Sequence, residues 1–155
     1  MWDRTLRVIL AVLGCVTCGL ALGATGWVQP EYTVTLSPAF AGAGQTRTGS
    51  TVLTLNHDGP ATIQASVVQA GDEVLSHDTT ADTLVTSYSL TGAALGASAD
   101  ADWVSSSQFV APARSYTVEG SGLSDITFHV RGAAAPLRAN DAGAYSASIV
   151  LTVTW

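Results

Sequence analysis

The segment DAGAYSASIVLTVTW, residues 141–155, decides the fold class. From position 145 onward, apolar side chains occupy every second position and polar ones most positions between them, with Val150 as the exception. A repeat of two residues predicts a β-strand with one buried face, and the β-branched and aromatic content favours the same structure. A strand at a chain end frays unless a sheet holds it. We therefore expect the whole apolar face to lie in a core: Tyr145, Ala147, Ile149, Leu151, Val153 and Trp155.

The rest of the chain shows further short alternating runs separated by residues typical of turns. These runs lie within residues 31–38, 50–60, 61–73, 82–92, 115–122 and 124–132. The sequence Asn-His-Asp-Gly-Pro at 56–60 interrupts two of them, and Asp-Gly and Pro favour turns. This break predicts a β-hairpin with a loop of about five residues. Residues 91–102 are small and polar, which predicts a long loop.

Many short strands with turn residues between them predict an all-β fold. We expect an antiparallel immunoglobulin-like β-sandwich of about seven or eight strands. The sequence lacks the Cys–Trp–Cys arrangement of true immunoglobulin domains, so the expectation concerns the architecture alone.

The N-terminal region has the features of an export signal. Two arginines precede an uncharged apolar run at 8–22, and small residues follow it. This pattern predicts a signal peptide at 1–23, cleaved before Ala24 or one residue later, and a single β-sandwich domain at 24–155. Two alternatives remain open: residues 8–28 as a retained membrane anchor, and a lipoprotein site at Gly14-Cys15. Both cysteines, Cys15 and Cys18, lie in the apolar run, so a cleaved chain would contain none.

The charge balance excludes some classes of partner. The chain contains twelve acidic residues and six basic ones, for a net charge of -6. An acidic chain without a basic patch is not expected to bind nucleic acid or anionic membrane surfaces. We expect an exported protein of the cell envelope, the cell surface or the extracellular space, with membrane contact only through an uncleaved N-terminal segment.

The sequence contains no pattern typical of a catalytic site. His57 and His77 each precede an aspartate, but no Gly-x-Ser-x-Gly motif accompanies them, and His57 lies in the predicted turn. The acidic residues within 72–82 follow no calcium-loop spacing, so solvated turns explain them better. We expect no enzymatic activity, no cofactor and no metal site. Trp103 is the one aromatic residue placed to offer an exposed ring to a sugar.

The closing strand resembles a known family. The sequence AGAYSASIVLTVTW is similar to the C-terminal strand of pilus subunits of the chaperone–usher class, in the spore coat U-like and archaic pilin branch. Gly143 and Tyr145 match the turn of that motif, and Trp155 matches its terminal aromatic residue. The alternating run between them is matched by Ile149, Leu151 and Val153. Unlike many members, the predicted mature chain has no cysteine, and the more familiar subunits carry the aromatic residue one position earlier.

The resemblance implies that the sandwich lacks one strand. In that family a periplasmic chaperone fills the groove first, and the N-terminal extension of another subunit fills it later. Residues 27–36 are a candidate donor segment, in which Tyr32, Val34 and Leu36 would fill alternate pockets. The alternative is that residues 32–36 form the first strand of a sandwich complete in itself.

Two functional hypotheses follow. The first is an exported, non-enzymatic structural or adhesive surface protein, a pilus-like subunit that assembles by β-strand complementation with copies of itself or related subunits. The second is a self-contained binding module of the envelope for a carbohydrate or protein ligand.

Overall fold

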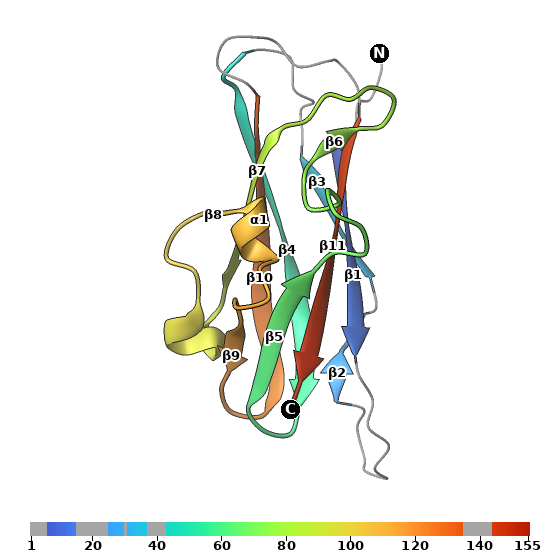
Figure 1. Cartoon of the computed structure of the whole chain (residues 1–155). Coiled ribbons are helices and arrows are strands. Elements are labelled where there is room, and N and C mark those ends of the chain that lie inside the picture. The colour runs from blue at the N-terminus through green and yellow to red at the C-terminus, as the bar shows by residue number, and fades with distance from the viewer. Residues whose placement is uncertain (1–5, 15–24, 30, 37–42, 135–143) are drawn as a thin grey trace.

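Two β-sheets pack face to face in the computed structural model of the chain, which describes residues 6–14, 25–29, 31–36, 43–134 and 144–155 (Figure 1). The first sheet has the order β3 (Glu31–Leu36), β1 (Leu6–Gly14), β11 (Tyr145–Thr154), β5 (Ala61–Ser66) and β9 (Tyr116–Val118), with β6 (Ser76–His77) beside the start of β11. The second has the order β2 (Gly26–Trp27), β4 (Thr46–His57), β10 (Gly122–Ala133), β7 (Val85–Thr91) and β8 (Val104–Ser105). The predicted all-β sandwich is confirmed.

The core lies between the sheets and follows the alternation of the strands. In β10, for example, Ile126, Phe128 and Val130 are fully buried while the residues between them are partly exposed. The ring of Phe128 stacks on that of Tyr88 with centroids 5.5 Å apart, and Phe109 lies 5.0 Å from Tyr88. Burial of one such side chain contributes roughly 1.5–3 kcal/mol, so these rings hold β7 and β10 to the helical turn that carries Phe109.

The C-terminal strand has the predicted phase. Every second residue from Tyr145 to Val153 is buried, and Ile149, Leu151 and Val153 have no exposed surface. The prediction is wrong for Trp155, whose side chain is 47% exposed. The strand and its pairing with β5 end at Thr154, so the alternation that buries Val153 does not continue to the next apolar residue.

The predicted hairpin at 56–60 is also wrong. The strand before this turn, β4, belongs to the second sheet, and the strand after it, β5, belongs to the first. The turn therefore crosses from one sheet to the other. His57 is 2% exposed and holds the turn: its Nδ1 lies 2.8 Å from the Gly59 carbonyl oxygen, and its Nε2 lies 2.8 Å from Ser124 Oγ. Because a carbonyl oxygen only accepts, Nδ1 donates the bond to Gly59, and in the neutral ring Nε2 then accepts from Ser124.

The predicted loop at 91–102 contains a short 3₁₀ helix, η1 (Ala93–Ser98), and a four-residue helix, α1 (Ser106–Phe109), follows further along the chain. Leu95 of η1 is buried, which anchors the segment to the core. Gly92 allows the chain to turn into η1. Its φ angle is 149°, and a Cβ atom there would lie 2.8 Å from the carbonyl oxygen of Asp125 in β10.

The phase of β11 predicts opposite responses to two neighbouring substitutions. Leu151→Ala removes a fully buried side chain and should lower the free energy of unfolding of the full chain by roughly 2–5 kcal/mol. Thr152→Lys changes a half-exposed residue of the other face and should cost less than about 1 kcal/mol. Urea unfolding of both variants measures the difference, and equal losses would contradict the assigned phase.

Candidate functional site: the strand position between β3 and β11

The strand orders identify one position of the sandwich as unusual. In immunoglobulin-like sandwiches the sheets contain strands A, B, E and D on one side and C, F and G on the other. The orders β2-β4-β10-β7 and β5-β11 correspond to A-B-E-D and C-F. The next position, that of strand G, is held by β1, which comes from the beginning of the chain instead of following β11 (Figure 1).

The direction of β1 distinguishes it from the other strands. It runs parallel to β11 through eight residue pairs, from Arg7–Ser146 to Gly14–Val153. It runs antiparallel to β3 through six pairs, from Leu6–Leu36 to Ala11–Glu31. All the other strand pairings among the described residues are antiparallel. A strand that followed β11 through a short turn would run antiparallel to it, so β1 runs opposite to the direction expected of a strand that continues the chain after β11.

The residues beside this position define what can occupy it. On β11, Ala147, Ile149 and Leu151 are buried, and on β3, Tyr32 and Val34 are buried. The residue pairs place Leu10 between Ile149 and Tyr32, and Val8 between Ala147 and Val34. Directly opposed residues of paired strands face the same side of a sheet. A strand in this position therefore needs apolar residues at alternate positions.

The occupant in the structure belongs to the apolar run that the sequence predicts to be an export signal. Residues 6–14, LRVILAVLG, carry a single charge, at Arg7. The boundaries predicted for the signal peptide, 1–23, and for the mature domain, 24–155, stay predictions, as do the anchor and lipoprotein alternatives.

The segment between the predicted cleavage site and β4 is bound to its own sandwich. The Trp27 indole N–H donates to the Leu151 carbonyl oxygen at 3.2 Å, which joins β2 in one sheet to β11 in the other. The amide of Val28 donates to the Thr54 carbonyl oxygen at 2.9 Å, and the Thr54 amide donates to the Tyr32 hydroxyl oxygen at 3.3 Å. The sequence did not suggest the bond from Trp27, because it joins residues 124 positions apart.

The structure thus brings most of the predicted assembly residues to one place. Tyr32, Val34 and Leu36 lie on β3, and Ile149, Leu151 and Val153 lie on β11, on opposite sides of β1. Tyr145 lies at the start of β11. Trp155 follows the end of that strand, and Gly143 falls outside the described residues. The role of these residues in assembly stays a prediction.

The start of β11 is covered by the acidic turn segment at 69–84. Tyr145 is 1% exposed, and its hydroxyl donates to Asp82 Oδ2 at 2.6 Å. The His77 ring meets that of Tyr145 edge-on with centroids 5.0 Å apart. Asp72 accepts from the Gln69 amide at 3.0 Å, within its own turn. These contacts give the carboxylates structural partners, but Asp82 is 6% exposed, so the interpretation as solvated turn residues does not hold for it.

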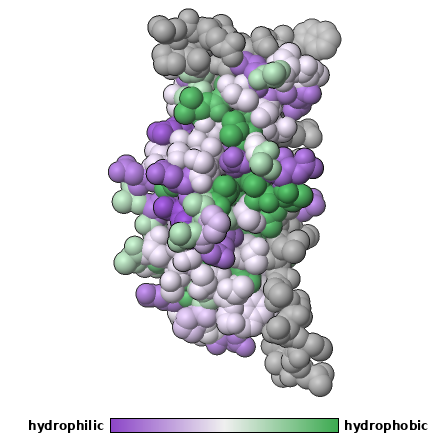
Figure 2. Space-filling model, in the orientation of Figure 1, coloured by the Kyte–Doolittle hydropathy of each residue, from purple (hydrophilic) through white to green (hydrophobic). Residues whose placement is uncertain are grey.

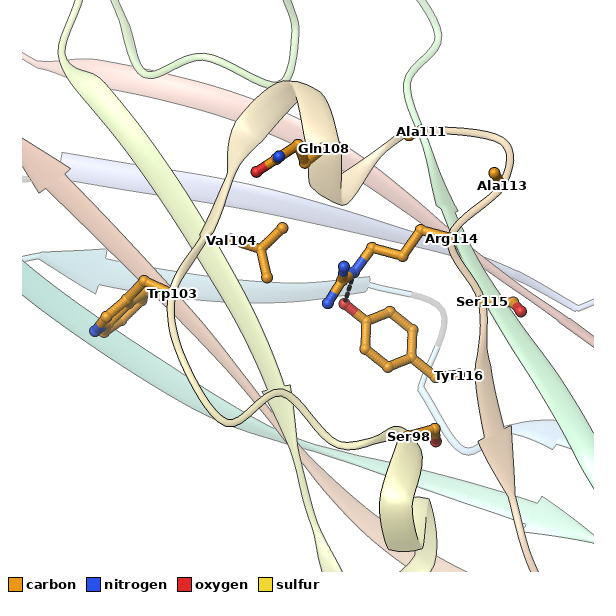
Figure 3. A pocket seen from close by; sticks show the side chains of 9 residues that line it. All are labelled: Ser98, Trp103, Val104, Gln108, Ala111, Ala113, Arg114, Ser115 and Tyr116. Atoms are coloured by element: carbon orange, nitrogen blue, oxygen red, sulfur yellow. Dashed lines mark hydrogen bonds between the residues drawn. The ribbon is translucent and has the colours of Figure 1, made fainter.

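A second feature is a hollow far from β1. It has a volume of about 550 Å³ and is lined by residues of the 98–116 segment, which passes along β8 and β9 on the opposite side of the molecule (Figures 1 and 3). Arg114 points into it, donating through Nε to the Tyr116 hydroxyl at 2.8 Å and pairing with Asp100. The Asp100 carboxylate is 2% exposed and also accepts from the Tyr116 hydroxyl at 2.9 Å.

Trp103, predicted as a sugar-stacking residue, lies at the rim of this hollow (Figure 3). The guanidinium group of Arg131 covers its ring at 4.8 Å from the centroid, and His129 meets the ring edge-on at 6.3 Å. Trp103 is only half-exposed. Arg131 therefore covers part of the ring, and the sugar-stacking role of Trp103 stays a prediction.

The molecular surface shows no dominant apolar patch on the face in view. Figure 2 shows hydrophobic areas there that are broken up by polar residues. The large apolar side chains that the described residues expose are spread over several strands and loops: Val28, Val52, Val68, Val85, Leu123 and Trp155. Single exposed apolar residues are ordinary on protein surfaces and define no site.

Comparison with known proteins finds similar structures but no similar sequence. No protein-family model matches the sequence, and no curated protein matches it. The structure is similar to the crystal structure of CfaE, the adhesive subunit of the CFA/I fimbria of enterotoxigenic Escherichia coli, with a TM-score of 0.35 and 10% identity. The match covers 77% of this chain and 44% of that one, so the chain spans less than half the length of that protein. Within the described residues, no helix has both the length and the apolar character needed to cross a membrane.

Two tyrosines should make the stability of the fold sensitive to alkaline pH. Burial raises the pKa of Tyr88, whose hydroxyl donates to the Glu73 carbonyl oxygen, and burial also raises the pKa of Tyr116. Because the folded-state pKa exceeds the value of about 10 for an unfolded chain, their contribution is complete below that pH and is lost as the pH rises above it. Absorbance titration of tyrosinate should show both residues ionising only as the protein unfolds. If the folded wild-type protein shows a tyrosinate absorbance step near pH 10 that is missing in Tyr88→Phe or Tyr116→Phe, the replaced tyrosine ionises in the native state. That result would contradict this expectation.

Proposed function

We propose that this protein is an exported, non-enzymatic subunit of a surface structure, with a structural or adhesive role, and that a β-strand from another polypeptide completes its sandwich. The observation that carries the proposal is the occupant of the position between β3 and β11. That position is held by residues 6–14, the segment that the sequence predicts to be removed on export.

Removal of β1 would leave β3 unpaired and one edge of β11 open. Among the described residues, β3 has no partner in its sheet other than β1, and β11 would lose its partner along eight residues. The buried side chains of Tyr32, Val34 and Ile149 belong to the two strands beside this position. Free strand edges bind other chains and cause aggregation, so an exported chain in this state requires a replacement strand.

The partners follow from this requirement. A periplasmic chaperone would protect the open position during export, and a related subunit or another copy would occupy it in the finished structure. Main-chain hydrogen bonds to β3 and β11 would supply affinity, and the alternate apolar positions would supply specificity. The second hypothesis, a self-contained module that binds a ligand at Trp103, is less favoured because Arg131 covers the ring of that residue.

Strand complementation can be measured with the mature chain, residues 24–155. A synthetic peptide with the sequence of residues 6–14 and charged residues added at both ends should bind it and raise its melting temperature. At a peptide concentration of 100 times the Kd, the expected gain is about 2.7 kcal/mol. The control peptide carries Leu10→Asp, which places a charge between Ile149 and Tyr32 in the observed register and should abolish the gain.

The opposite result would reject strand complementation. A mature chain that unfolds cooperatively at the same temperature with either peptide, and that binds neither, has a complete sandwich without β1. That outcome would reject strand complementation and leave residues 6–14 as an export signal alone.

A further inference from the structure

The distance along the chain between the predicted cleavage site and the first strand limits what the mature protein can donate. Cleavage before Ala24 leaves two residues ahead of β2, which begins at Gly26. Two residues span at most about 7 Å. The occupant of the open position pairs with eight residues of β11, a length of about 26 Å at roughly 3.3 Å per residue. The residues ahead of β2 are therefore too few to fill this position in another molecule.

The residues that follow already bind within their own sandwich. Trp27 pairs with Leu55 of β4 and donates its indole N–H to β11. Tyr32 is 8% exposed and Val34 is 1% exposed, and both pack in the core of their own sandwich. If β3 moved to the open position of a second copy, the part of the core that Tyr32 and Val34 cover in the first copy would be exposed. The exchange would bury the core of one copy by uncovering that of the other.

We infer that the mature chain accepts a β-strand from a different polypeptide and donates none. This inference rests on the proposed function and narrows it, because it excludes polymers built from this chain alone. The partner must carry an extended segment of about nine residues that is apolar at alternate positions at least and uncharged after its second residue, since the segment that occupies the position here has these features. In a linear assembly, a subunit that accepts but cannot donate stands at an end.

The hollow lined by residues of the 98–116 segment would stay accessible in such an end subunit. Its lining segment passes along β8 and β9, which are the edge strands on the side of the two sheets opposite β3 and β2. A partner strand between β3 and β11 would leave this side uncovered (Figure 1).

The experiment uses the mature chain, residues 24–155, saturated with a fluorescent peptide of residues 6–14. The complex is freed of excess peptide and concentrated, and size-exclusion chromatography with light scattering follows its mass and its bound fluorescence. The inference predicts a monomeric complex that keeps its peptide when unlabelled mature chain is added in tenfold excess over the complex. In the matched control, the added protein is an unrelated soluble carrier with a flexible linker and residues 6–14 fused to its end. This fused variant can donate a strand and has no position of its own to fill, so it should release the peptide.

The possible outcomes distinguish failure of the inference from failure of the proposed function. Peptide release by the unmodified mature chain, together with a series of oligomers, would show donation and overturn the inference while leaving strand complementation intact. A mature chain that never binds the peptide would overturn both, because it accepts no strand. Retention of the peptide against the mature chain, with release by the fused variant, supports the inference.

Discussion

The pairing of β11 along both of its edges is the constraint on which the rest of the structure depends. This strand carries five buried side chains of the core and lies between β5 on one side and β1 on the other. The partner on the β5 side comes from the body of the sandwich. The partner on the β1 side comes from a segment that export is predicted to remove. The main-chain groups of an inner strand need partners on both edges. If β1 is removed, another polypeptide must supply the partner on that edge, and the proposed function follows from this requirement.

Local patterns predicted the main strands of residues 24–155, but they predicted neither how those strands pair nor that residues 6–14 form a strand. The alternation from Tyr145 to Val153 predicted a strand and its buried face, because side-chain direction depends only on neighbouring residues. The turn at 56–60 has the same composition whether it joins strands within one sheet or across two, and only the rest of the molecule decides between them. Trp155 continues the alternation in the sequence but lies beyond the last paired residue, so it is exposed.

The candidate site was predictable in part for the same reason. The sequence placed Tyr32, Val34 and Ile149 on apolar strand faces, but it could not reveal that β3 and β11 lie on either side of one position. Residues 6–14 are uncharged after Arg7 and apolar, a pattern that suits an export signal and a buried strand equally well. The bonds from Trp27 to Leu151 and from Tyr145 to Asp82 join distant parts of the chain, so no sequence pattern indicated them.

Amide hydrogen exchange of the mature chain, residues 24–155, tests the central claim most directly. The amides of residues 31–36, and those of β11 that point toward the β1 position, should exchange rapidly in the chain alone and slowly once a strand is bound. The amides of β4 and β10, which pair with each other along twelve residues, should be protected in both states and serve as the internal reference. Equal protection of β3 and β11 before and after addition of a strand would contradict the account.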